Sequence, residues 1–227
     1  MSDGRSTTPD ARAFETWIFD LDNTLYPARC NLFAQVDRRM GEFIGDLLGL
    51  DPVAAKALQK RYFREHGTTL RGLMTVHGVD PYQFIDYVHQ IDVTPVPPSP
   101  RLDRALGRLA GRKLIFTNGS VRHADAILAR LGVGHHFDTV FDIVASDFVP
   151  KPEIAPYRKL IAEHRVAPRT AIMFEDIARN LAPAHALGMT TVWVPGLSEW
   201  SRNGAGGDHI HHVAPDLEDW LDRVAPP

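Results

Sequence analysis

The chain has 227 residues, of which 44% are hydrophobic and 23% charged, and a formal net charge of −3 at pH 7. These values are typical of a globular protein without long disordered stretches, and the lack of excess basic charge argues against a polymeric nucleic acid as partner. One cysteine, Cys30, excludes an internal disulfide and a thiolate metal cluster.

The N-terminal segment is polar. Residues 1–13 lack the apolar core of a secretion signal, and no later apolar run has the length of a membrane span. We therefore expect a cytoplasmic protein without a membrane partner.

The first predicted strand is the apolar run Trp17-Ile18-Phe19, which ends at Asp20 and Asp22. Side chains alternate along an extended strand, so two carboxylates separated by one residue lie on the same face. The sequence therefore predicts a paired-acid site at the end of this strand.

The next segment has a helical pattern. Apolar residues at helical spacing up to Gly49 predict an amphipathic helix, and they are Leu32, Phe33, Val36, Met40, Phe43, Ile44, Leu47 and Leu48. Asp51-Pro52 and Asp80-Pro81 each place a capping side chain before a proline at the first helical position, which predicts two more helices. The proline-rich stretch 94–100 is typical of an extended connector. We predict an all-helical domain over residues 29–97, inserted into a core domain of residues 14–28 and 98–227.

Strands and helices alternate beyond the connector. Strands are predicted at 113–116, 140–144, 171–174 and 190–194, and helices at 102–109, 120–131, 156–164 and 177–187. Alternation with Val-, Ile- and Phe-rich strands predicts an α/β fold: a Rossmann-like parallel sheet with helices on both faces. The ligand site of such a sheet lies beyond the carboxyl ends of its strands.

Polar residues follow three of these strands. Thr117-Asn118-Gly119 precedes a predicted helix at Ser120, and the N-terminus of a helix favours anions. Lys151 follows the next strand and adds a positive charge. Glu175 and Asp176 end the strand after that, and Asp176 offers a hard oxygen ligand of the kind that Mg²⁺ prefers.

These residue types suit phosphoryl transfer. Asp20 can act as a nucleophile that forms an acyl phosphate, and Asp22 can protonate the leaving oxygen. A magnesium ion held by Asp20 and Asp176 would reduce the repulsion between Asp20 and the incoming phosphate.

Four segments together resemble the motifs of the haloacid dehalogenase-like phosphatases, in the same order and spacing: residues 19–25, 116–119, 151–152 and 174–176. The resemblance implies that Asp20 is the nucleophile and that Asp22 is the acid/base, whose backbone carbonyl also holds Mg²⁺. It implies that Thr117, Asn118 and Lys151 bind the phosphoryl group and that Asp176 is a metal ligand. Glu175 and Asn180 would lie near the metal, in its outer shell.

Three further segments, residues 25–27, 67–73 and 87–92, resemble the pyrimidine 5′-nucleotidase branch of that family. This resemblance implies a small phosphorylated metabolite, a nucleoside 5′-monophosphate, as substrate. Arg71 and Thr68 would then contact the base or sugar, and Tyr26, Tyr62 or Tyr87 could stack on a ring. The helical insert would act as a cap that excludes water and selects the leaving group.

Other functions stay open at this point. The substrate could be a sugar phosphate, phosphoglycolate or flavin mononucleotide, or the enzyme could be a phosphomutase similar to β-phosphoglucomutase. Outside the enzymes, a phosphate-responsive regulatory domain also gathers acids, a Thr and a Lys at strand ends. A dehalogenase is disfavoured because a leaving halide needs no proton, which leaves no task for Asp22. The sequence does not indicate an oligomeric state.

Several histidines are not expected to take part in chemistry. His123 and His185 fall on predicted helices and are expected to be surface or packing residues. The group from His209 to His212 lies beyond the motifs and has no accompanying carboxylate pattern, so we do not expect it to bind a metal.

Overall fold

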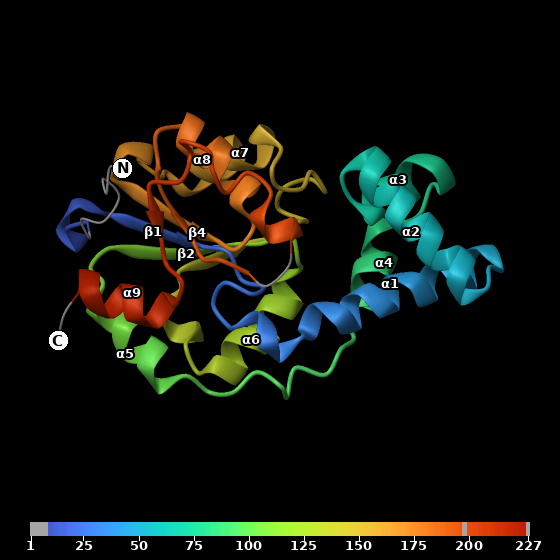
Figure 1. The fold of residues 1–227 in the computed structure, drawn as a ribbon, viewed down its shortest axis with the longest axis horizontal. Helices are drawn as coiled ribbons and strands as arrows, with labels where there is room; N and C mark the ends of the chain where they lie inside the picture. The colour runs from blue at the N-terminus through green and yellow to red at the C-terminus, as the bar shows by residue number, and fades with distance from the viewer. Residues whose placement is uncertain (1–8, 197–198, 226–227) are drawn as a thin grey trace. The chain divides into compact units, whose positions relative to one another are not determined.

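The structure is a computed structural model, which describes residues 9–196 and 199–225. The chain divides into two compact units (Figure 1). The core unit contains the residues up to Cys30 and those from Val96 onwards, and the helical unit contains Asn31–Pro95.

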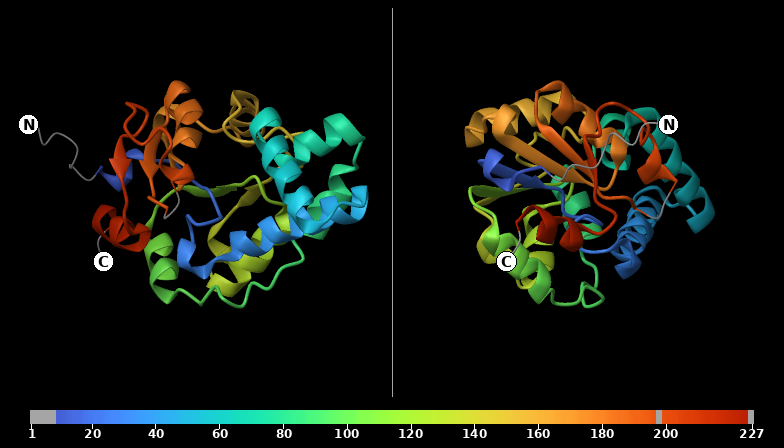
Figure 2. Two further views of the ribbon diagram at one scale, coloured as in Figure 1. Left: turned by 45° about the vertical axis from the view of Figure 1, so that its right-hand side comes forward. Right: turned by 60° about the vertical axis from the view of Figure 1, so that its left-hand side comes forward.

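A parallel sheet organises the core unit. Its strands follow the order β3-β2-β1-β4-β5-β6, and they are β1 (Thr16–Phe19), β2 (Arg112–Phe116), β3 (Thr139–Phe141), β4 (Ala171–Glu175), β5 (Thr190–Trp193) and β6 (His212–Val213). The helices are α5 (Pro100–Arg108), α6 (Val121–Leu131), α7 (Ile154–His164), α8 (Leu181–Ala186) and α9 (Leu217–Val224). Figures 1 and 2 show α7 and α8 on one face of the sheet and α5, α6 and α9 on the other. The predicted α/β fold is confirmed.

The central strand β1 is buried on both faces. Phe19 stacks on Phe174 with ring centroids 4.6 Å apart, and Phe174 meets Trp220 of α9 edge-on at 5.1 Å. Ile18 points to the opposite face, where it belongs to a buried cluster with residues of α7 and α8. Each buried side chain of this size stabilises the fold by about 1.5–3 kcal/mol, so the position of the end of β1 is well fixed.

The strand order reverses direction at β1, which pairs with β2 on one side and with β4 on the other. Ligands of open parallel sheets bind beyond the carboxyl ends of the strands at such a reversal. Asp20 follows β1 there, and its N–H donates to the carbonyl of Phe174 at 2.9 Å. The topology therefore brings the ends of β1 and β4 side by side.

The core unit differs from the prediction at three places. β3 ends at Phe141 rather than at residue 144, because the carboxylate of Asp142 accepts hydrogen bonds from the N–H groups of Val121 (3.0 Å) and Ala145 (2.8 Å) and turns the chain. The predicted helix 177–187 is a 3-10 turn, Ala178–Asn180, followed by α8. β6 and α9 were not predicted.

The helical unit consists of α1 (Leu32–Leu48), α2 (Pro52–His66), α3 (Thr69–His77) and α4 (Pro81–Val88). Asp51, Thr68 and Asp80 cap α2, α3 and α4 with their side chains. Of the helices in residues 9–196 and 199–225, none combines the length and the apolar character that crossing a bilayer requires.

Candidate active site

Three carboxylates and one ammonium group meet at the ends of β1 and β4. Asp20, Glu175 and Asp176 each offer one oxygen within 4.8 Å of the others, and all three residues are buried. We call these three residues the acid group. The Nζ of Lys151 lies 2.7 Å from Asp20 Oδ1 and 2.6 Å from Glu175 Oε2, and it also donates to the carbonyl of Phe116 at 2.8 Å. A buried lysine thus joins the ends of β1, β2 and β4.

When fully ionised, the three carboxylates of the acid group carry more negative charge than the single ammonium group of Lys151 balances. Burial, together with the charge of Glu175, raises the pKa of Asp20, and burial together with the charges of Glu175 and Asp20 raises the pKa of Asp176. Burial alone would lower the pKa of Lys151, but its ion pairs with Asp20 and Glu175 outweigh burial and raise it. Lys151 therefore stays charged, and the acid group would gain from a further cation.

These shifts predict how stability depends on pH in the absence of metal. The unfolded chain releases the Asp20 and Asp176 protons near the ordinary aspartate pKa of 3.8, whereas the folded chain keeps them to higher pH. The folded state then binds more protons, so the free energy of unfolding falls as pH rises from that value through the raised pKa values. Melting temperatures measured in EDTA should fall between pH 5 and pH 9, and the slope should be shallower in Asp176→Asn. The same slope in the parent and in Asp176→Asn would contradict the raised pKa of Asp176.

Glu175 is held by the protein on both of its oxygens. Oε2 accepts from Lys151, while Oε1 accepts from Asn180 Nδ2 at 3.1 Å and from the N–H of Ile177 at 3.3 Å. Asn180 is buried and lies behind Glu175, on the turn that precedes α8. These contacts fix the carboxylate of Glu175, which in turn fixes Lys151.

Asp20 is oriented by two different donors. Oδ1 accepts from Lys151, and Oδ2 accepts from Thr24 Oγ1 at 2.9 Å. Asn23 has a φ of 62°, in the left-handed region that Asn tolerates better than most residues, and this tight turn returns Thr24 towards the strand end.

Asp22 has separate surroundings. Its Oδ1 accepts from Tyr26 Oη at 2.6 Å and lies 2.8 Å from Nε2 of His123, on the first turn of α6. Burial would lower the pKa of His123, but the charge of Asp22 outweighs it and raises the pKa, while burial and Asp22 together raise the pKa of Tyr26. Tyr26 therefore remains a hydrogen-bond donor to this carboxylate.

Sequence reasoning missed both of these partners. Tyr26 was expected to offer a ring for stacking and His123 to be a surface or packing residue, yet both are buried against Asp22. Tyr62 is also buried, with its hydroxyl 2.6 Å from Nε2 of His77, so its ring is not available for stacking either. The sequence signal for His123 was its place on the first turn of the helix that follows Thr117-Asn118-Gly119.

The loop after β2 lies beside Asp22. Thr117 is buried, and its Oγ1 accepts from the N–H of Gly119 at 2.9 Å. A Cβ at Gly119 would stand 3.3 Å from Thr117 Oγ1 and 3.7 Å from Asp22 Oδ2, so the loops after β1 and β2 are in close contact. The side chain of Asn118 accepts from the N–H of Lys151 at 2.9 Å and so positions the backbone of that lysine.

Arg71 and Thr68 belong to the helical unit, whereas the acid group belongs entirely to the core unit. Thr68 Oγ1 accepts from the N–H of Arg71 at 3.1 Å as the cap of α3, and Arg71 is exposed. Their part in substrate selection stays a prediction.

The C-terminal histidines hold the end of the core unit together. His209 Nε2 lies 3.1 Å from the carbonyl of Ala178, and His211 Nδ1 accepts from the N–H of Thr191 at 3.1 Å. Among the described residues, the groups whose geometry suits a metal ion do not include these histidines.

Comparisons with known proteins find one family model and several relatives. Residues 14–188 match the family model described as haloacid dehalogenase-like hydrolase. The chain is 27% identical over 158 residues to Phosphate metabolism protein 8 of Saccharomyces cerevisiae, covering 62% of this chain and 49% of that protein. It is 35% identical over 100 residues to Fructose-1-phosphate phosphatase YqaB of Escherichia coli, covering 43% of this chain and 52% of that protein. The matches thus span about half the length of these two curated relatives.

Solved structures share the fold. An L-2-haloacid dehalogenase from Xanthobacter autotrophicus superposes with a TM-score of 0.56 at 18% identity, covering 93% of this chain and 98% of that one. A HAD phosphatase from Thermococcus onnurineus superposes with a TM-score of 0.58 at 18% identity, covering 88% and 93%. At such identities the likeness concerns the fold alone.

Proposed function

The chain belongs to the haloacid dehalogenase-like hydrolase family, and from that premise we propose that it is a magnesium-dependent phosphatase of small phosphate monoesters. The observation that carries the proposal is the separation of two acids: Asp20 beside the ammonium group of Lys151, and Asp22 beside Tyr26 and His123. This separation supports Asp20 as the acid that attacks and Asp22 as the acid that exchanges a proton.

A magnesium ion fits the acid group. Its donors are hard carboxylate oxygens that lie within 4.8 Å of one another. When ionised, they carry more negative charge than Lys151 balances, so a cation would stabilise them. We assign Asp20, Asp176 and the backbone carbonyl of Asp22 as the groups that would hold it. When bound, the ion supplies positive charge to the phosphoryl oxygens. Phosphate release should stop in EDTA and return with added Mg²⁺, and full activity in EDTA would refute the assignment.

The chain's own residues account for the two chemical steps. In the first, a carboxylate oxygen of Asp20 attacks phosphorus, the bond from phosphorus to the leaving oxygen breaks, and Asp22 gives that oxygen its proton. In the second, water attacks phosphorus, Asp22 takes a proton from the water, and the bond to Asp20 breaks. Thr117, the N–H groups after β2 and Lys151 would hold the phosphoryl oxygens.

The surroundings of Asp22 favour a phosphatase over a dehalogenase. A halide leaves as an anion without a proton, so a dehalogenase has no use for an acid held by Tyr26 and His123. A phosphomutase would use both acids. Formation of phosphate, rather than an isomer, from a hexose phosphate decides between hydrolase and mutase.

The partners of Asp22 lead to a specific kinetic prediction. His123→Gln and Tyr26→Phe should lower kcat/KM, which reports the first chemical step, by about 10–100-fold on an alkyl phosphate, part of the full contribution of a general acid. The loss should be much smaller on p-nitrophenyl phosphate, because p-nitrophenolate leaves without a proton. His185→Gln, a histidine on α8, serves as control and should retain parental rates on both substrates. Equal losses on both substrates would assign His123 and Tyr26 a merely structural role.

We further propose nucleoside 5′-monophosphates as the substrate class, with Arg71 and Thr68 as residues that select the leaving group. The resemblance of residues 67–73 to the pyrimidine 5′-nucleotidases supports this proposal. Similarity to a fructose-1-phosphate phosphatase makes sugar phosphates the second class to test. Phosphate release should be compared over nucleotides, sugar phosphates, phosphoglycolate and flavin mononucleotide. Arg71→Ala should raise KM for the preferred nucleotide and leave turnover of p-nitrophenyl phosphate unchanged; turnover of sugar phosphates alone would refute the nucleotide assignment.

A further inference from the structure

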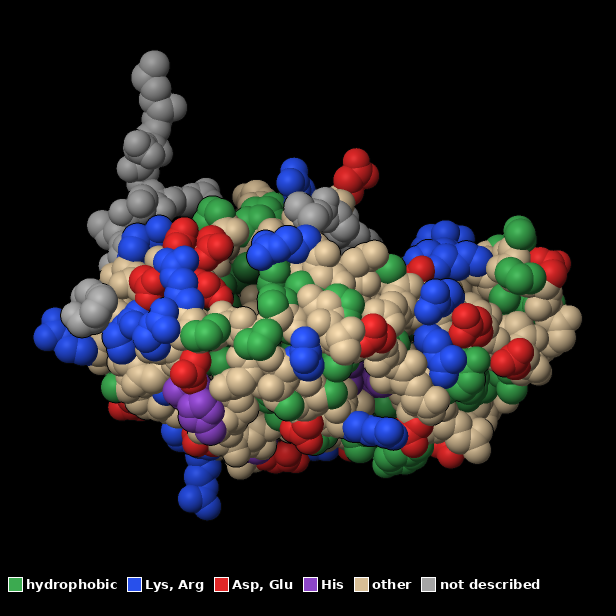
Figure 3. All heavy atoms as spheres, turned by 90° about the horizontal axis from the view of Figure 1, so that it is seen from below, with side chains coloured by type: hydrophobic (Ala, Val, Ile, Leu, Met, Phe, Trp, Pro, Cys, Tyr) green, Lys and Arg blue, Asp and Glu red, His purple; other side chains and the backbone are tan. Residues whose placement is uncertain are grey.

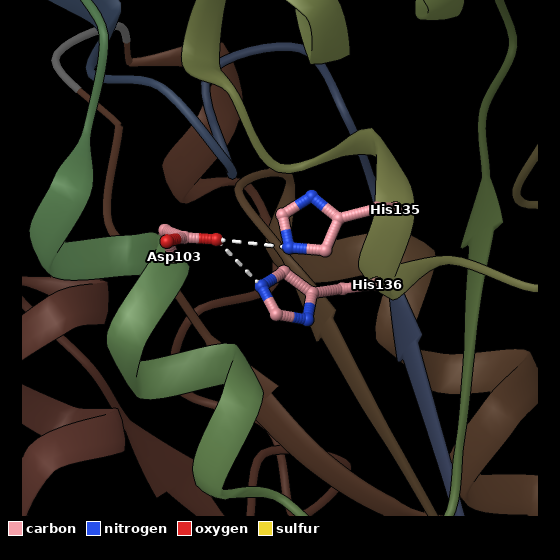
Figure 4. A group of neighbouring side chains, drawn as sticks. All are labelled: Asp103, His135 and His136. Carbon is pink, nitrogen blue, oxygen red and sulfur yellow. Dashed lines mark hydrogen bonds and ion pairs between the residues drawn. The ribbon is translucent and has the colours of Figure 1, made fainter.

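A second group of metal-ligand side chains lies on the core unit, on elements that contribute nothing to the acid group. Asp103 stands in the first turn of α5, and His135 and His136 form the end of a 3-10 turn, Gly134–His136, that precedes β3. Nε2 of His136 lies 2.8 Å from Asp103 Oδ1, and Nε2 of His135 lies 3.2 Å from the same oxygen. Figure 4 shows both rings directing this nitrogen at the one carboxylate oxygen. We propose that Asp103, His135 and His136 bind a divalent transition-metal ion of the Zn²⁺ type.

The donor set has the chemistry of such an ion. Two imidazole nitrogens and one carboxylate oxygen are the ligands that zinc and its neighbours take in sites with an open coordination position. The three donor atoms lie within 4.8 Å of one another, so small side-chain movements would bring each to the 2.0–2.2 Å of a zinc bond. Without an ion, both imidazoles direct Nε2 at the same oxygen of Asp103. With an ion, each donor has its own bond.

The backbone holds the two sides of the group in place. Ser99 caps α5 by accepting from the N–H of Leu102 at 3.2 Å, and its own N–H donates to the carbonyl of Leu131 at 3.0 Å, which ties the start of α5 to the end of α6. On the other side, the N–H of His136 donates to the carbonyl of Val133 at 3.1 Å. Both ligand-bearing segments are therefore fixed before an ion arrives.

The two histidines differ in exposure, which suits an exchangeable site. The side chain of His136 is 14% exposed and packs over α5, where a Cβ at Gly107 would stand 3.5 Å from its Cε1. The side chain of His135 is 65% exposed. Figure 3 shows histidine side chains beside an acidic one at the surface of this face of the molecule. The less exposed ligand, His136, would fix the ion, while His135 would bind it from the solvent side and leave room for water.

The two sites offer different types of ligand, and they would therefore prefer different metal ions. The acid group offers only carboxylates, which suit Mg²⁺, whereas two imidazoles favour a softer ion. A bound ion would join α5 to the turn that leads into β3, an edge strand of the sheet. We therefore expect Zn²⁺ to stabilise the folded chain independently of Mg²⁺.

The test is a Zn²⁺ titration of the full chain without a histidine tag, followed by calorimetry and by the visible spectrum of Co²⁺ as a substitute ion. The parent should bind one equivalent at this site, and Asp20→Asn should retain it, which separates it from any binding at the acid group. His136→Gln and Asp103→Asn should lose that equivalent, while His164→Gln, a histidine on α7, should keep it. Saturating Zn²⁺ should raise the melting temperature of the parent by about 5 °C or more and leave that of His136→Gln unchanged.

Parental circular dichroism and Mg²⁺-dependent activity of His136→Gln would show that the variant is folded. The same Zn²⁺ stoichiometry in the parent and in His136→Gln would overturn the proposal, because the ion would then be bound elsewhere. If the parent binds no Zn²⁺, the proposal is equally wrong, and the three side chains form only a polar contact between α5 and the 3-10 turn Gly134–His136.

Discussion

Replacing Asp20 by Asn should lower phosphate release by about four powers of ten or more, which corresponds to at least about 5.5 kcal/mol of transition-state stabilisation. The amide has the shape of the carboxylate and can still accept from Thr24, but it cannot form an acyl phosphate with phosphorus. Turnover of p-nitrophenyl phosphate with Mg²⁺ measures the loss. Asp125→Asn, an exposed aspartate on α6, is the matched control and should retain the parental rate.

The same variant should stay folded. Burial and the charge of Glu175 disfavour the charged form of Asp20, and the charge of Asp20 in turn disfavours the charged form of Asp176, so a neutral side chain at position 20 relieves both repulsions. We expect the melting temperature of Asp20→Asn at pH 8 without metal to equal or exceed that of the parent. A variant that unfolds would contradict this expectation, and an active variant free of contaminating phosphatase would refute covalent catalysis.

Replacing Lys151 by Met should abolish turnover and also lower the free energy of unfolding by about 3–5 kcal/mol. The ammonium group of Lys151 pairs with both Asp20 and Glu175, and its side chain is 1% exposed. Without the ammonium group, both carboxylates become buried charges that have lost their ion pair with it, which destabilises the fold. The stability loss should be larger at pH 8 than at pH 5, because the carboxylates with raised pKa take up protons as the pH falls.

Two further variants separate the structural and the catalytic parts of Lys151. Lys113→Met is a matched control: Lys113 is also buried, but it donates to the neutral carbonyls of Leu109 and Gly111, so its loss should cost less. Lys151→Met combined with Glu175→Gln removes one carboxylate and should regain part of the stability without regaining turnover. Denaturant unfolding measures both effects, and a Lys151→Met protein as stable as the parent would contradict the account.

Local pattern was enough to predict most of the helices and strands in the two units. Apolar runs that end at polar residues indicated β1, β2 and β4, and capping residues before prolines indicated α2 and α4. β6 has only two residues, which is too short to leave a period-two pattern. α9 had a readable signal, since Leu217, Trp220, Leu221 and Val224 have helical spacing after the cap Asp216.

The sequence was enough to predict which candidate site residues lie together at strand ends. It was not enough to predict the contacts that depend on how the helices and loops pack. Asp20 and Asp176 stand at strand ends, so the parallel sheet alone brings them together. His123 meets Asp22 across 101 positions of sequence, from the first turn of α6. The place of His123 on the first turn of α6 indicates that it lies near the loop after β2, but it does not show that Asp22 is its partner. The sequence likewise does not show that the side chain of Asn118 accepts from the backbone N–H of Lys151, because packing brings these two loops together.

Chemical trapping of the phosphoenzyme tests the central claim most directly. An acyl phosphate is an activated carboxyl group that borohydride reduces to an alcohol, so a borohydride quench during turnover should convert Asp20 into homoserine. Peptide mapping by mass spectrometry should find this change at Asp20, only when substrate and Mg²⁺ are present, and not in Asp20→Asn. Substrate-dependent reduction at Asp22 or Asp176 instead, or steady turnover without any reduced aspartate, would contradict the account.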